Sequence, residues 1–270
     1  MGTLLEFKAN VVDGVHNELT KKLKPIMLRR RKNEVATDLP PRTEEIVKIP
    51  FTAEQSTIYD AQLNAARSKC NGTMQLLTAL TRLRQICCHP KLVEDNYPHT
   101  AAKLELLTEM VTELLAEEHN VLIFSQFTSM LDIIKAEFDT HAIPHLKLTG
   151  STPNKERAQL VNTFNDSDEP QAFLLSLKAA GTGLTLTKAD YVIIFDPWWN
   201  PAVENQAIDR THRIGQKRPV IAYRFIMADS IEEKVLDLQD EKRAIFQAAV
   251  DGVEMADVSL TADDLARLLE

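Results

Sequence analysis

The chain has 270 residues, of which 44% are hydrophobic and 26% are charged, and its formal net charge is -8. This is the composition of an ordinary globular protein, and it excludes a wholly basic protein that coats nucleic acid, so any DNA contact is expected to be local. Three cysteines and no run of about 18 apolar residues argue against a disulfide scaffold and a membrane span, and favour an intracellular location.

Residues 1–100 are predicted to be an accessory region of helices and connectors. A basic stretch, KKLKPIMLRRRK, precedes an extended and proline-marked one, DLPPRTEEIVKIPF. Two segments with apolar residues at helical spacing follow, and the second ends at CCHP. Structural zinc needs four spaced ligands, and no second Cys/His pair with suitable spacing appears. We therefore interpret Cys87 and Cys88 as buried side chains near a helix end that Pro90 terminates.

Between residues 101 and 228, short apolar runs alternate with amphipathic helical segments. The runs are VLIF, LKLT, FLLS, YVIIF and VIAYRFI. Continuous apolar runs are typical of strands buried on both faces, so we predict a doubly wound α/β domain with a mostly parallel sheet. Its functional loops should lie at the carboxyl ends of the strands. Residues 229–270 are predicted to be helical, with Ser230 and Glu233 forming a capping box.

Polar loops follow the first three of these strands. They are SQFTSM, TGSTPNKER and SLKAAGTGLTLTKAD. Hydroxyls, glycines and lysines at a helix N-terminus can bind an anion, but a bare strand-to-helix turn prefers the same residues. The G-x-x-x-x-G-K-[ST] phosphate loop and a D-E-x-[DH] metal motif are both absent from the sequence. The chain is therefore not expected to bind and hydrolyse a nucleotide by itself.

The fourth loop, DPWWNP, is expected to open a helix that Asn200 caps and that ends near Gly215. Gln206, Asp209, Arg210 and Arg213 would then lie along one side of this helix. Paired arginines are most often surface salt-bridge partners. The alternative is a transition-state clamp, in which fixed guanidinium groups meet the negative charge of a transferring phosphoryl group. Such arginine fingers can come from a different domain than the phosphate loop.

The order of these motifs resembles the second RecA-like lobe of the SNF-type double-stranded-DNA translocases of helicase superfamily two. The matching stretches are LRRRKNEVATDLPPRTE, LRQICCHPKL, VLIFSQFTSMLD, LTGST, SLKAAGTGLTLTKADYVIIFDPWWNPAVENQAIDRTHRIGQKRPV and SIEEKVLDLQDEKR. The resemblance implies a linker and protrusion at 1–100, a RecA-like lobe at 101–228 and a helical brace at 229–270. The implied parent protein is a chromatin-remodelling, DNA-repair or transcription-associated motor. It would be located in the nucleus of a eukaryote or in the cytoplasm and nucleoid of a prokaryote.

In that family, ATP binds between two lobes, and the second lobe donates arginine fingers. The resemblance implies catalytic roles for Arg210 and Arg213 with Gln206. It implies contacts with the cofactor from Gly181, Gly183, Asp209, Gly215 and Gln216. ATP with Mg²⁺ would be bound mainly by the N-terminal lobe, which this chain lacks and which is its implied partner.

The resemblance also implies a second partner, duplex DNA, which may be nucleosomal in the parent protein. The residues expected along one DNA strand are Ser125, Gln126, Thr149, Gly150, Ser151, Arg157, Lys178, Thr182, Trp199 and Asn200. Ala180 and Thr185 depart from the glycine and asparagine usual in the family, which affects the DNA grip more than the arginines. Two alternatives stay open: a DNA-binding or partner-docking module without a catalytic contribution, and an RNA-helicase lobe, which the Trp-Trp-Asn-Pro element and long helical extensions disfavour.

Overall fold

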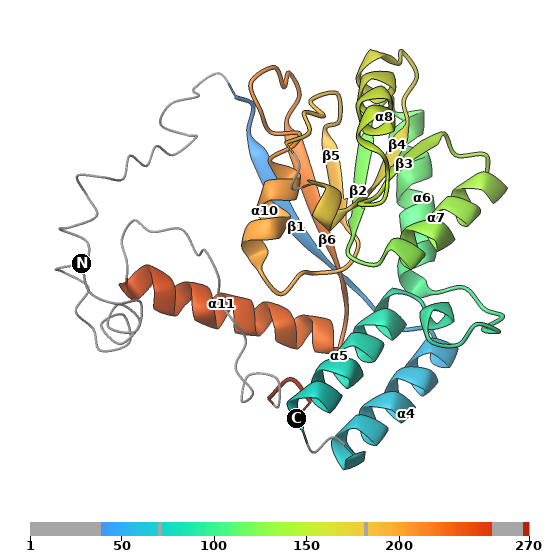
Figure 1. The fold of residues 1–270 in the computed structure, drawn as a ribbon, viewed down its shortest axis with the longest axis vertical. Coiled ribbons are helices and arrows are strands. Elements are labelled where there is room, and N and C mark those ends of the chain that lie inside the picture. The colour runs from blue at the N-terminus through green and yellow to red at the C-terminus, as the bar shows by residue number, and fades with distance from the viewer. Residues whose placement is uncertain (1–38, 70–71, 181–182, 250–266, 270) are drawn as a thin grey trace.

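The computed structural model describes residues 39–69, 72–180, 183–249 and 267–269 (Figure 1). The basic stretch at 21–32 and most of the last 21 residues, which were expected to be helical, lie outside this part. The third cysteine, Cys70, and two predicted site residues, Gly181 and Thr182, also lie outside it.

A six-stranded sheet forms the centre of the fold, with the order β1-β6-β5-β2-β4-β3. Every pairing in it is parallel. The strands are β1 (Arg42–Ile49), β2 (Val121–Ser125), β3 (His145–Leu148), β4 (Ala172–Ser176), β5 (Tyr191–Ile194) and β6 (Val220–Met227). The predicted α/β architecture is therefore confirmed, and the described sheet is wholly parallel.

Helices cover both faces of the sheet (Figure 1). They are α4 (Ala53–Lys69), α5 (Thr73–Cys88), the 3-10 helix η1 (Pro90–Leu92), α6 (Ala102–Ala116), α7 (Thr128–Thr140), α8 (Asn154–Asp166), α9 (Leu177–Ala180), α10 (Pro201–Ile208) and α11 (Ile231–Ala249). Alternate residues of β2 belong to two different cores: Ile123 packs with α5, α6, α7 and α11, whereas Leu122 packs with α8, α9 and α10. The central strands are continuously apolar because both of their faces are buried.

Strand β1 differs from the prediction that residues 1–100 are helices and connectors. It pairs with β6 along its whole length of eight residues, from Arg42 opposite Val220 to Ile49 opposite Met227. β1 is an edge strand, and most of its side chains are exposed or half-buried. It therefore lacks the apolar run that marks the central strands, and it is held chiefly by main-chain pairing.

Helices α4 and α5 lie side by side below the sheet, and α11 extends beside them from the end of β6 (Figure 1). α5 ends at Cys88, because His89 is extended and Pro90 follows it. Cys87 and Cys88 are fully buried, so the interpretation of CCHP as a helix end with buried thiols is confirmed. Burial raises the pKa of both thiols.

The start of α11 shows a variant of the predicted capping box. The Ser230 hydroxyl accepts a hydrogen bond from the N–H of Glu232 at 3.0 Å, and the Glu233 carboxylate accepts one from the N–H of Asp229 at 2.8 Å. Two of the N–H groups at this helix start are therefore satisfied by side chains. No helix in the described part of the chain is long and apolar enough to cross a bilayer.

Candidate functional site

The four loops that follow β2, β3, β4 and β5 lie along one edge of the sheet. These strands are neighbours in the order β5-β2-β4-β3, and their register places Ser125 opposite Ser176 and Phe124 opposite Ile194. Because the strands are parallel, their carboxyl ends meet at the same edge. The fold therefore brings together the loops that the sequence marked as polar.

Asp196, directly after β5, anchors the loop that carries the two tryptophans. It is fully buried, and its carboxylate accepts hydrogen bonds from the Ser125 hydroxyl and from the N–H of Gln126, the latter at 3.1 Å. Burial raises the pKa of Asp196, and the Ser125 hydrogen bond and the charge of Arg84 partly offset this effect. The buried hydroxyl of Ser125 supports this loop, and the contact of this residue with DNA stays a prediction.

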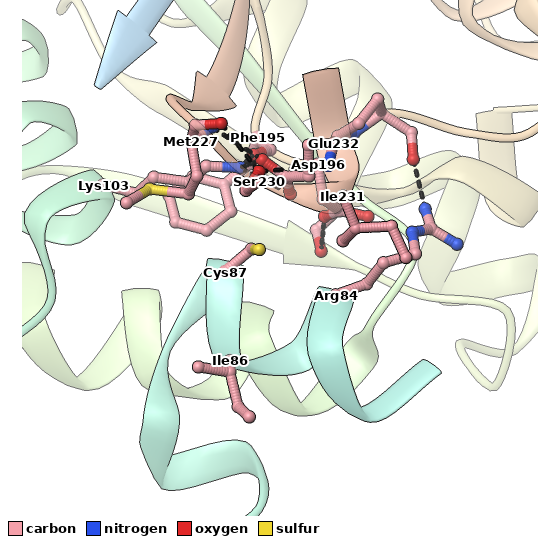
Figure 2. A network of polar contacts seen from close by, with 12 residues as sticks. Arg84, Ile86, Cys87, Lys103, Phe195, Asp196, Met227, Ser230, Ile231 and Glu232 are labelled. Atoms are coloured by element: carbon pink, nitrogen blue, oxygen red, sulfur yellow. Dashed lines mark hydrogen bonds and ion pairs between the residues drawn. The ribbon is translucent and has the colours of Figure 1, made fainter. Parts of the chain in front are cut away.

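Side chains from three helices hold the main chain of the same loop. Arg84 of α5 donates a hydrogen bond to the carbonyl of Pro197 (Figure 2). Gln239 of α11 donates to the carbonyl of Trp198, and the N–H of Trp198 donates to Glu204 of α10 at 2.6 Å. The main-chain path of residues 196–200 is therefore determined in part by side chains from distant positions in the sequence, Arg84 and Gln239.

The two tryptophans pack against opposite cores. Trp199 contacts the core on the side of α5, α6, α7 and α11, and Trp198 contacts the core on the side of α8, α9 and α10. The Asn200 side chain caps α10 as predicted, because it accepts a hydrogen bond from the N–H of Ala202 at 2.9 Å. Trp199 and Asn200 are half-buried and use their side chains within the fold, and their contact with DNA stays a prediction.

Helix α10 ends sooner than predicted. Its last residue is Ile208, so Arg210 and Arg213 lie in the following turn and do not share a helix face with Gln206. The Thr211 hydroxyl donates to the carbonyl of Ile208 at 2.8 Å. Such side-chain bonds to the main chain compete with continuation of a helix. The expected single helical face is therefore wrong, although Gln206 itself is exposed on α10.

Gly215 and Gln216 build the turn that carries the arginines. Gly215 has φ +105, a conformation that favours glycine. The Gln216 amide donates to the carbonyls of Ala189 at 2.7 Å and Thr211 at 3.3 Å. Its oxygen accepts hydrogen bonds from the next two N–H groups of the chain. Gln216 is buried and its amide is engaged within the protein, and the contact of both residues with the cofactor stays a prediction.

The two predicted finger arginines lie close enough to affect each other. Arg210 is 7% exposed, and within the described part of the chain its Nε has no hydrogen-bond partner. Burial lowers the pKa of Arg210, and the charge of Arg213 lowers it further. Arg213 donates to the carbonyl of Asp209 at 3.1 Å and to the Thr185 hydroxyl at 3.2 Å. Two guanidinium groups in one turn, each disfavouring the charge of the other, would suit a multiply charged anion such as a phosphate.

Strand β1 contributes a contact to this turn that was not predicted from the sequence. Arg42 donates to Asp209 at 3.2 Å and to Asn205 at 2.8 Å. His212 of the same turn lies 2.9 Å from the carbonyl of Pro40. The edge strand therefore fixes one side of the turn. Asp209, expected at the cofactor, is in this way tied to the sheet.

The remaining predicted residues differ in their accessibility. Gly150, Ser151, Lys178 and Gly183 are exposed, Gln126 and Arg157 are half-buried, and Thr149 is buried. The Thr149 hydroxyl shares a hydrogen bond of 2.8 Å with the Ser151 hydroxyl, which forms the turn after β3. Lys178 and Ser151 therefore offer exposed polar groups at the edge of the sheet.

A buried ion pair close to the loop was missed from the sequence. The Lys103 ammonium of α6 lies 2.6 Å from the Glu232 carboxylate of α11 and donates to the carbonyl of Phe195 at 2.9 Å (Figure 2). Glu232 also accepts a hydrogen bond from the N–H of Met227 at 2.9 Å. Burial opposes the charge on Lys103, but Glu232 outweighs this effect and the pKa of Lys103 is raised. The pair joins α6, α11 and the ends of β5 and β6.

Two family models match the chain. The model described as "Helicase conserved C-terminal domain" matches residues 102–215, and the model described as "SNF2-related domain" matches residues 6–92. The first match runs from the start of α6 to the arginine turn. The second extends over α4 and α5 to the end of η1.

Curated relatives match nearly the whole chain. An uncharacterized ATP-dependent helicase of Mycoplasma genitalium is 34% identical over 271 residues, covering 98% of this chain and 26% of the relative. A putative ATP-dependent helicase/translocase of Bacillus subtilis is 39% identical over 242 residues, covering 84% of this chain and 26% of the relative. The chain thus spans about a quarter of the length of these relatives.

Solved structures share the fold. The SWI2/SNF2 ATPase core of Sulfolobus solfataricus in complex with double-stranded DNA is 30% identical, with a TM-score of 0.70 over all of this chain and 60% of that one. The C-terminal domain of the Sulfolobus ATPase is 28% identical, with a TM-score of 0.67 over 85% of this chain and 98% of that one.

Proposed function

The chain belongs to the SNF-type family of helicase superfamily two as a C-terminal RecA-like lobe, and on that premise we propose that it is the second motor lobe of an ATP-dependent translocase on double-stranded DNA. One observation carries the proposal. Arg210 and Arg213 lie in one turn, close enough for the charge of Arg213 to lower the pKa of Arg210, in a chain whose sequence has no phosphate loop. Half of an anion site of this kind is what a lobe that donates arginine fingers should present.

In this proposal the nucleotide is ATP with Mg²⁺, held mainly by the N-terminal lobe of the same protein. ATP supplies a γ-phosphoryl group whose negative charge must be stabilised during transfer. Arg210 and Arg213 would meet that charge, while Asp209 and Gln216 keep their turn in place. Gln206, exposed one turn before the arginines, would face the same cleft.

Duplex DNA, bare or nucleosomal, is the proposed track. Lys178 and Ser151 are exposed at the carboxyl edge of the sheet, where they can reach phosphates, and Arg157 and Gln126 are partly accessible beside them. Two relatives support this choice by their names: the Bacillus protein is called a helicase/translocase, and the Sulfolobus core is bound to double-stranded DNA. The protein would then work in the nucleus of a eukaryote or the nucleoid of a prokaryote.

We also propose a division of labour along the chain. Residues 1–100 would serve as linker and protrusion, with β1 returning to the sheet, residues 101–228 as the motor lobe and residues 229–270 as the brace. The buried pair of Lys103 and Glu232 supports a brace that is fixed to the lobe.

A protein containing both lobes tests the proposal by DNA-stimulated ATP hydrolysis. Arg210→Ala and Arg213→Ala should each reduce turnover by about 10³- to 10⁵-fold, the range seen for arginine fingers, with little change in DNA affinity. Lys217→Ala is the matched control, because Lys217 is an exposed cation just beyond the turn, and it should turn over normally. Near-normal turnover in both arginine variants would contradict the finger assignment.

The second candidate is a DNA-binding or partner-docking lobe without a catalytic contribution. The internal engagement of Gln216 and the exposed Lys178 are compatible with it. It predicts normal turnover in the arginine variants together with weaker DNA binding after Lys178→Ala. A phosphate-loop lobe encoded just upstream in the parent gene would favour the motor.

A further inference from the structure

Arg84 of α5 is buried inside the motor lobe although its helix belongs to the accessory region. Only 2% of the residue is exposed. It donates a hydrogen bond to the carbonyl of Pro197, and its guanidinium carbon lies 4.5 Å from the centre of the Trp199 ring and 6.0 Å from that of Phe127. Arg84 thus touches the Trp-Asn-Pro loop at two points, its main chain and an aromatic ring.

A charged side chain is a costly way to fill this space. Burial lowers the pKa of Arg84, and the nearby Asp196 carboxylate opposes that effect. Among the residues that the structure describes, the Nε of Arg84 has no hydrogen-bond partner. An apolar side chain of similar volume would pack here without desolvating a charge. The presence of an arginine at position 84 is therefore explained by its polar and aromatic contacts and not by the need to fill this volume.

The contacts of Arg84 determine the course of the loop. A planar guanidinium can stack on a ring and donate in its own plane at the same time, which a lysine ammonium cannot do. Arg84 therefore links the Trp199 ring to the carbonyl of Pro197 through one side chain. Gln239 and Glu204 hold the loop at Trp198 through hydrogen bonds to its main chain.

We propose that Arg84 is a positioning residue that holds residues 196–200 in the conformation with which Trp199 and Asn200 meet a DNA strand. The α4–α5 hairpin and this loop then move as one unit, and a displacement of the hairpin changes the grip on DNA. The positioning itself follows from the fold, whereas its effect on DNA rests on the proposed function.

Fluorescence of the 270-residue chain tests the positioning without DNA or ATP. The chain has two tryptophans, so Trp198→Phe leaves Trp199 as the single emitter. In that background, Arg84→Met should shift the emission and increase quenching by acrylamide, and Arg84→Lys should restore only part of the shielding. Arg82→Met is the matched control, because Arg82 is exposed on the same helix. Identical spectra and quenching for Arg84→Met and Arg82→Met would overturn the proposal.

A double-mutant cycle in a protein with both lobes tests the effect on DNA. Arg84→Lys should raise the DNA concentration for half-maximal ATPase stimulation by at least about twofold, because a lysine ammonium cannot keep the ring contact and the hydrogen bond at once and because a cation–π contact is worth more when it is desolvated. If Arg84 acts through Trp199, adding Arg84→Lys to Trp199→Leu should produce no further rise. Effects that multiply instead would overturn the proposal, and lysine keeps this arm usable if Arg84→Met does not fold.

The two hypotheses fail separately. If the unmodified two-lobe protein shows no DNA-stimulated hydrolysis, the proposed function is rejected, and the fluorescence comparison still decides whether Arg84 positions the loop. If stimulation is present and either the fluorescence comparison or the double-mutant cycle gives its contrary result, the positioning role is rejected and the motor assignment stands.

Discussion

At the scale of single residues, the buried charged side chains lie where distant segments meet. Lys103 and Glu232 join α6 to α11, and Arg84 joins α5 to the loop after β5 (Figure 2). Each is offset by a partner, because an unpaired charge in the interior is strongly unfavourable. Charged side chains would be expected at the surface from the sequence of each helix alone. In the fold, these side chains instead connect the helices to the lobe.

Removing one member of the buried pair should destabilise the fold strongly. Lys103→Met leaves the Glu232 carboxylate buried without its partner, and we expect a loss of about 3–5 kcal/mol in the free energy of unfolding. The double variant Lys103→Met with Glu232→Leu should lose less, because no uncompensated charge remains. Urea unfolding of the chain measures both changes.

An exposed pair on the same chain provides the control. Lys135 and Asp139 form an i,i+4 pair at 2.6 Å on α7, in a solvated setting. Lys135→Met should therefore leave the urea midpoint nearly unchanged. If Lys103→Met lowered the free energy of unfolding no more than Lys135→Met does, the proposal that the Lys103–Glu232 pair fixes the brace to the lobe would be wrong.

At the scale of elements, the start of α10 follows local chemistry, whereas its end depends on a contact with another segment. Asn200 and Pro201 start α10 as the sequence predicts. Its end depends on Thr211 and on Gln216, which bonds the carbonyl of Ala189 before β5. A contact with another segment thus supports the turn where the helix ends. That turn places Arg210 beside residues 185–189, and the carbonyl of Arg210 accepts a hydrogen bond from the N–H of Leu186.

Substitution of the cap separates its structural role from its proposed DNA contact. Asn200→Ala should cost about 1 kcal/mol of stability, because the N–H of Ala202 loses its acceptor. Asn200→Ser keeps an acceptor and should cost much less. Thermal or urea unfolding gives the two values, and equal losses would show that capping is not the role of Asn200 in the fold. Weaker DNA binding in both variants would assign the contact to the amide.

At the scale of the whole molecule, the candidate site lies at the carboxyl ends of the strands, and helices packed on the sheet hold its loops in place. Residues 196–200 lie between the two cores, with Trp198 on one and Trp199 on the other. The accessory helices α5 and the brace α11 both contact this loop from the same side of the sheet. Movement of either helix should therefore be transmitted to the edge where DNA is proposed to lie.

The 270-residue chain by itself should not hydrolyse ATP. Its sequence contains no phosphate loop and no acidic metal motif, so nothing orients the phosphates against the arginines. Phosphate release measured with and without duplex DNA should stay at the background level, while a protein with both lobes, assayed in parallel, should show turnover. Clear turnover by the pure chain would mean that the architecture proposed above is wrong.

The sequence by itself determined the central sheet and the family. The apolar runs of β2, β4 and β5 are visible because those strands are buried on both faces, and the capping of α10 is visible because it needs only neighbouring residues. The order of the motifs indicated the SNF-type lobe, which the comparisons support. Local patterns of this kind report burial and turns, since both act on residues close together in the chain.

The tertiary structure alone decided how the site is supported. The contacts between Arg42 and Asp209, Arg84 and Pro197, and Lys103 and Glu232 link positions 167, 113 and 129 residues apart. No local periodicity marks such pairs. The stretch that forms β1 was expected to be extended, but its pairing with β6 escaped prediction, because an exposed edge strand is selected by main-chain pairing and not by an apolar run. Pairing across long separations depends on the folded arrangement of the whole sheet, and a single sequence carries no local signal for it.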